Sequence, residues 1–140
     1  MIDAALINEF IAENVTPRYP ALRELRVDVD SGNQLHVRVR TSATLIPVVT
    51  LQLEVERKAI LDPRPTVRFR IRKQGFSGMI AMLLPTFAHK LPPFLRLSAE
   101  TVEVDLPTLL DQWHRVLALL VSLEIETSPQ SLQVALELRA

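Results

Sequence analysis

The stretch LRELRVDVDSGNQLHVRVR, residues 22–40, decides the fold. Every second residue from Leu25 to Val29 is apolar, and the same holds from Leu35 to Val39, while the residues between them are polar or charged. Alternation with a period of two is typical of a strand with one buried and one solvated face. Ser31, Gly32 and Asn33 supply the turn. The stretch therefore predicts an antiparallel hairpin.

The same alternation continues outward from this hairpin. It recurs over Val49–Arg57 and Val67–Arg72, and the segment Asp62–Pro65, which holds two prolines, reads as a stiff turn between them. Together with Leu25–Asp30 and Leu35–Arg40, these runs predict four consecutive antiparallel strands with one apolar and one polar face.

The ends of the chain supply helices and further strands. Ile2, Leu6, Phe10 and Ile11 recur at helical spacing and predict a first helix with these residues inward. A second helix is expected from Asp105, with Trp113 buried. Strands are expected over 101–104, 121–126 and 132–138, the last two joined by the turn SPQS. The sum is one α+β domain over residues 1–140, an antiparallel meander of six or seven strands with two or three helices packed on its apolar face.

Composition narrows the function. The 140 residues carry 16 basic and 16 acidic side chains, and nucleic-acid binding is not expected because phosphate contacts need a basic surplus. There is no cysteine, so disulfides and thiolate chemistry are excluded. No secretory signal or spanning segment is recognised, which favours a cytoplasmic protein.

The segment FSGMIAMLLPTF, Phe76–Phe87, holds no charged residue. It predicts an apolar helix over residues 76–90, kinked at Pro85. Such a helix has three interpretations: ordinary core, the lid of an apolar ligand cavity, or an interface with another surface. The pattern alone leaves all three open.

Catalytic motifs are absent. Asp111 and His114 share a helical face, but no spacing supplies further metal ligands, so neither a metal nor another cofactor is expected. The serines lack a nucleophile elbow, and glycine is too scarce for a phosphate-binding loop. The sequence predicts a protein that is not an enzyme.

The polar face of the meander carries an arrangement of charges. With the strands paired in sequence order, Glu54 and Glu56 are expected to lie between Arg38 and Arg40 on one side and the arginines of 68–72 on the other. Opposite charges across strands stabilise a sheet and fix its register. The alternative is a basic strip that makes peripheral contact with anionic lipid head groups.

The order of elements resembles a known family. An initial helix, a long meander, an apolar helix ending in two prolines and the segment LPPFLRLSAETVEV, Leu91–Val104, are similar to the tubular lipid-binding (TULIP) superfamily, in particular its small bacterial envelope members. The resemblance implies a strongly curved sheet wrapped around a helix, with acyl chains in the groove between them. The ligand-binding residues it implies are Met79, Ile80, Met82, Leu83, Leu84, Phe87 and Phe69.

The sequence therefore favours a non-enzymatic domain that holds a lipid or another long apolar ligand between the helix 76–90 and the inner sheet face. The alternative is a protein interaction or assembly module, such as a homodimer formed through a sheet edge or through the apolar helix.

Overall fold

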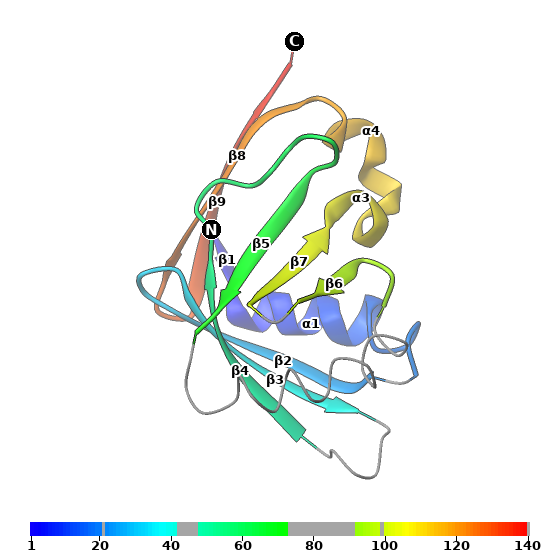
Figure 1. The fold of residues 1–140 in the computed structure, drawn as a ribbon, viewed down its shortest axis with the longest axis vertical. Helices are drawn as coiled ribbons and strands as arrows, with labels where there is room; N and C mark the ends of the chain where they lie inside the picture. Colours follow the sequence, from blue (N-terminus) through cyan, green and yellow to red (C-terminus); the bar gives the residue numbers. More distant parts are fainter. Residues whose placement is uncertain (21, 42–47, 73–91, 99, 140) are drawn as a thin grey trace.

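The computed structural model describes residues 1–20, 22–41, 48–72, 92–98 and 100–139 (Figure 1). The chain begins with strand β1 (Ile2–Asp3) and helix α1 (Ala4–Asn14), followed by β2 (Leu22–Asp30), β3 (Gln34–Thr41), β4 (Val48–Val55) and β5 (Thr66–Ile71). Then come β6 (Leu95–Leu97), β7 (Thr101–Asp105), α3 (Leu106–Leu109), the 3-10 turn η1 (Asp111–Trp113), α4 (His114–Leu117), β8 (Leu120–Ser128) and β9 (Ser131–Leu138).

The strands form two antiparallel sheets instead of the single sheet that the sequence predicted. One has six strands in the order β2-β3-β4-β5-β7-β6, and the other has three in the order β1-β9-β8. The six-stranded sheet is strongly curled into a half-barrel (Figure 1). The fold is α+β, with sheet as its larger part.

The predicted hairpin and meander are confirmed. β2, β3, β4 and β5 are consecutive neighbours, and the first turn is made by Gly32 and Asn33, which both have a left-handed backbone with φ of 69° and 60°. Val27 lies opposite Val37, which in turn lies opposite Leu51, so the apolar residues of three strands share one face. The strands predicted over 101–104, 121–126 and 132–138 are also present, as β7, β8 and β9.

Helix α1 is present, but its buried face is only partly the predicted one. Ile11 is buried as predicted and Phe10 is half-buried, whereas Leu6 is 54% exposed and Ala4 is buried in addition. The cause is Asn8, whose amide donates to Val27 O (2.8 Å) and accepts from Val27 N (2.7 Å) on β2. These two hydrogen bonds satisfy the backbone N–H and C=O of Val27 on an edge strand, and they turn Ile7 and Ile11 toward the sheet.

The second helix is shorter than predicted. Asp105 caps it, accepting from Thr108 N at 3.3 Å, as the sequence indicated. The chain then leaves helical geometry at Leu110 (φ −115°, ψ 55°) and continues as η1 and α4. Because the helix breaks there, Trp113 does not reach the core, and it is 52% exposed. The prediction of a buried Trp113 was wrong.

The two sheets are joined through Asn33, which the sequence marked only as a turn residue. Its side-chain Nδ2 donates to Val55 O (3.1 Å) on β4 and to Ile125 O (3.0 Å) on β8, and its Oδ1 accepts from Thr127 N (3.0 Å). One amide therefore satisfies backbone groups of both sheets at their junction.

Candidate apolar binding site

A cavity of about 370 Å³ lies between α1 and the inner face of the six-stranded sheet. Its floor comes from the inward residues of β3, β4 and β5, among them Val37, Leu51 and Phe69. These side chains are half-buried, whereas Leu35, Leu53 and Val67 of the same strands also line the cavity and are buried. The half-buried residues are therefore the more accessible part of the floor.

Helix α1 makes one wall of this cavity. Ile7, Phe10, Ile11 and Val15 contribute to the lining, and Ile11 and Val15 are also buried in a cluster with Leu22. Asn8 fixes the helix to β2 by the two bonds described above. The wall is thus held by polar bonds at one point and by packing at another, so the space beside it does not depend on a loop.

The opposite wall comes from the later part of the chain. Phe94 is buried and its ring meets that of Tyr19 edge to face, with centroids 5.8 Å apart. β6, β7 and α3 add further apolar side chains, which are Leu95, Leu97, Val102, Val104, Leu106 and Leu109.

The lining is almost purely hydrocarbon. Of the described residues around the cavity only Thr127 is polar, and its hydroxyl is donated to Asp30 O. A ligand in this space would gain by burying apolar surface and would find no group to pair with a charge. The described lining can hold an apolar chain, and none of the described side chains in it is titratable.

Of the predicted ligand-binding residues, Phe69 lies in the cavity wall, beside Val67 of the same strand. Met79, Ile80, Met82, Leu83, Leu84 and Phe87 lie outside the described residues, as does the whole of the predicted helix 76–90. Phe10 and Ile11 of α1 were predicted to point inward, but the wall that α1 makes was not predicted, because the ligand site was assigned to the helix 76–90 and to Phe69. Asn8, a polar residue within the helical face between Ala4 and Ile11, was the available signal.

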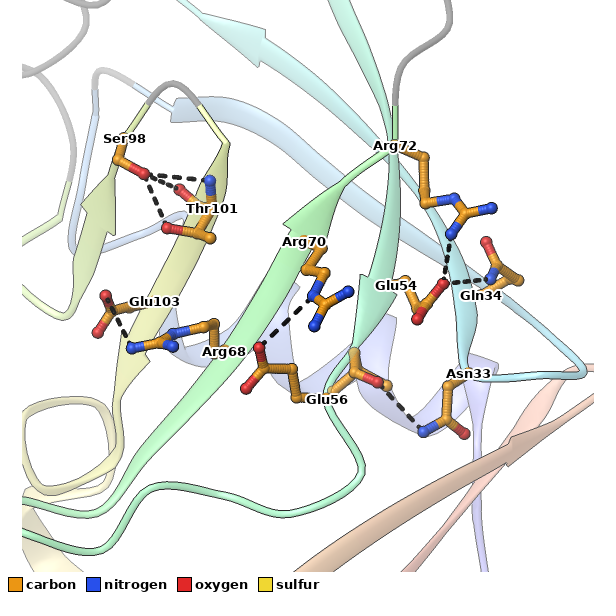
Figure 2. Close-up of polar contacts among 11 residues, drawn as sticks. Asn33, Gln34, Glu54, Glu56, Arg68, Arg70, Arg72, Ser98, Thr101 and Glu103 are labelled. Carbon is orange, nitrogen blue, oxygen red and sulfur yellow. Dashed lines mark hydrogen bonds and ion pairs between the residues drawn. The ribbon is translucent and has the colours of Figure 1, made fainter.

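The outer face of the sheet carries ion pairs between neighbouring strands (Figure 2). Arg72 lies 2.7 Å from Glu54, Arg70 lies 3.7 Å from Glu56, and Arg68 lies 3.9 Å from Glu103. The predicted pairing of these glutamates with the arginines of β5 is therefore confirmed.

The predicted pairing on the β3 side was wrong. Glu54 lies opposite Gln34, which donates to it, whereas Arg38 lies opposite Thr50 and Arg40 lies opposite Val48. The short turn at 31–33 fixes which residues of β2 and β3 lie opposite each other. The connection over 42–47 is longer, so the alternation in the sequence does not specify which residues of β3 and β4 lie opposite each other. On the other side, Arg38 lies opposite Arg26 of β2, so two like charges share this part of the face.

A second, polar groove of about 580 Å³ opens to solvent at the junction of the two sheets, beside Asn33, Glu56 and Glu126. Its acidic groups are matched by arginines, since Arg57 reaches Glu126 at 3.0 Å and Arg70 reaches Glu56. The groove is therefore lined by opposite charges that face solvent in pairs.

The histidines do not form a reactive cluster within the described part of the chain. His114 Nδ1 lies 2.8 Å from the backbone oxygen of Asp111, not from its carboxylate, and His36 is exposed on β3. Among the residues that the structure describes, no three His, Asp or Glu side chains gather as metal ligands would. The same described residues include no helix with the length and apolar character to cross a bilayer.

No protein-family model, curated protein or solved structure matches this chain. The resemblance to tubular lipid-binding proteins therefore stays a prediction from the sequence, and function has to be argued from the geometry above.

Proposed function

We propose that this chain is a non-enzymatic binding domain for a lipid or another long apolar ligand, held in the cavity between α1 and the inner face of the curled sheet. The observation that carries the proposal is the hydrocarbon lining of that cavity. In this proposal α1 and α3 are the helices that cover the apolar face.

The cavity favours a single hydrocarbon chain as occupant. Its volume of about 370 Å³ is in the lower part of the range of roughly 300–1,000 Å³ that ligand pockets span. Since the lining offers a ligand no charge partner, a charged head group would have to remain at the mouth, in water. Acyl chains of fatty acids or of one-chain lipids have this character.

Native mass spectrometry of the purified protein is the direct test. We expect adducts of acyl-chain mass, or uptake of a long-chain fatty acid added as a probe. The informative variant is Val37→Phe, because Val37 is half-buried and lies in the more accessible part of the cavity floor. The added ring should fill the cavity and displace the ligand, while circular dichroism stays native and thermal stability equals that of the lipid-free unmodified protein.

Thr50→Phe is the matched control, since it adds the same ring to the exposed outer face of the neighbouring strand. It should leave ligand uptake intact. A protein that carries no adduct and takes up no probe would refute the proposal. In that case Val37→Phe should destabilise by about 1–3 kcal/mol, as overpacking of a closed core does.

A further inference from the structure

Strand β9 has one edge that is only partly paired. β8 covers its other edge along the whole strand, whereas β1 reaches only Ser131 and Leu132. From Gln133 to Leu138 the second edge has no strand partner within the described residues (Figure 1). A row of free backbone donors and acceptors of this length is a template for another strand.

The same part of β9 is also uncovered on its faces. Leu136 is 55% exposed and Leu138 is 41% exposed. Ala135 and Glu137, which alternate with these leucines along the strand, are exposed as well. Across the ladder Leu136 lies opposite Leu123 and Leu138 lies opposite Leu120, so these leucines share one face. A two-stranded ribbon with bare leucines is marginally stable in water, and a third strand stabilises it.

We infer that a second copy of this chain adds its own β9 to this edge, antiparallel and centred on Leu136, to form a two-fold dimer with a continuous sheet β8-β9-β9-β8. The pairing is self-complementary, as a two-fold interface requires. Leu136 would meet Leu136 of the other copy, and Val134 would meet Leu138. Leu123 and Leu136 of both copies would then form one apolar row across four strands.

Charge and the position of β1 select this centre over its neighbours. With the axis at Leu136, Glu137 lies opposite Ala135, and no acid faces an acid. An axis at Glu137 would bring two carboxylates together, which destabilises a pair of strands. An axis at Ala135 would place Leu138 of the second copy opposite Leu132, where Ile2 of β1 already pairs. This inference does not depend on the ligand proposal.

The test uses disulfide cross-linking. Because the chain contains no cysteine, a single introduced cysteine has no partner within its own chain. At the proposed axis the two Cα atoms would lie about 4.5–5.5 Å apart, within the range that a disulfide spans. Leu136→Cys should therefore oxidise to a covalent dimer. Leu6→Cys is the matched control, since Leu6 on α1 is a leucine of equal exposure, and it should stay largely monomeric.

Light scattering with size exclusion gives the second readout. The unmodified protein should show the mass of two chains, Leu136→Lys should show the mass of one, and Leu6→Lys should remain a dimer. Circular dichroism should be native for both variants, since both positions are exposed. A single-chain mass at every concentration would overturn the inference. So would a dimer that survives Leu136→Lys, or a Leu6→Cys that cross-links as fast as Leu136→Cys.

Discussion

At the scale of single residues, two side-chain amides hold the architecture together. Asn8 ties α1 to β2, and Asn33 ties the β2–β3 turn to β4 and β8. Each side-chain amide hydrogen-bonds to backbone groups at the edge of a sheet, in the way that a neighbouring strand would. Buried backbone groups that lose their partners are costly, so both residues are expected to matter more than their position in a helix and a turn suggests.

Asn33→Gly separates the hydrogen bonds of Asn33 from its conformation, because glycine accepts the positive φ of 60°. We expect a loss of about 2–4 kcal/mol in the free energy of unfolding, since three backbone groups lose a partner. Urea denaturation measures it. Gln130→Gly is the control, because Gln130 also has a positive φ (62°), and this change should be neutral or slightly stabilising. Equal effects of the two substitutions would show that only backbone strain is involved.

At the scale of elements, the sequence fixes which face of a strand is buried but not how far one strand is shifted against the next. The period of two correctly placed the apolar residues Val27, Val37 and Leu51 on one face of the sheet. It could not specify that Glu54 meets Gln34 instead of an arginine, because the face pattern is unchanged by a shift of two residues. Helical spacing likewise does not specify which side of a helix is buried. Leu6 and Trp113 were assigned to the core although they are exposed.

The corrected register changes the expected effect of reversing charge on β4. Replacing Glu54 and Glu56 by Lys breaks the contacts to Arg72 and Arg70. It does not place a lysine opposite Arg38 or Arg40. Because these pairs are partly exposed, we expect a loss of about 1 kcal/mol at low salt that shrinks at high salt. Glu9→Lys with Glu13→Lys on α1 makes the same change in net charge and should have a smaller effect. Equal losses in the two double variants would mean that total charge, not pairing, is responsible.

Asp105 offers a second test at this scale, because it both caps α3 and binds Arg64 through two contacts of 3.0 and 3.2 Å. Asp105→Asn should keep the cap and weaken the ion pair, whereas Asp105→Ala should lose both. We expect Asp105→Ala to cost about 1–2 kcal/mol and Asp105→Asn to cost less than half of that. Thermal melts of the two Asp105 variants and of Arg64→Ala measure the contribution of the helix cap and that of the ion pair separately. A greater loss for Asn than for Ala would contradict the assignment.

At the scale of the whole molecule, the candidate cavity depends on elements from distant parts of the chain. α1, the meander and the segment 94–109 each supply a wall. The sequence predicted the sheet and the first helix, but it predicted that the helix 76–90, not α1, would enclose the ligand. Alternation identifies an apolar face; it does not reveal which helix covers that face or how completely. The concave sheet implied by the family resemblance is present, while the predicted lid residues lie outside the described part of the chain.

A ligand in this cavity should stabilise the entire fold, because it would bind the folded chain only. At a free concentration one hundred times the dissociation constant the expected gain is about 2.7 kcal/mol. Stripping the purified protein of bound lipid should therefore lower its melting temperature, and adding a long-chain fatty acid should restore it. Val37→Phe should melt at the same temperature with or without the fatty acid. A rise in that variant as large as in the unmodified protein would place binding elsewhere.

The pairing of β1 with β9 has a consequence for the order in which the domain forms. Ile2 pairs with Leu132, so this ladder must bring together two segments that lie far apart in the sequence. The β2–β3 hairpin can close as soon as it emerges, whereas the three-stranded sheet must wait for β9. Contacts of such separation slow folding, because loop closure precedes any gain from them. A nascent chain halted before residue 120 should therefore expose the apolar faces of α1 and the meander, and should bind chaperones that recognise them.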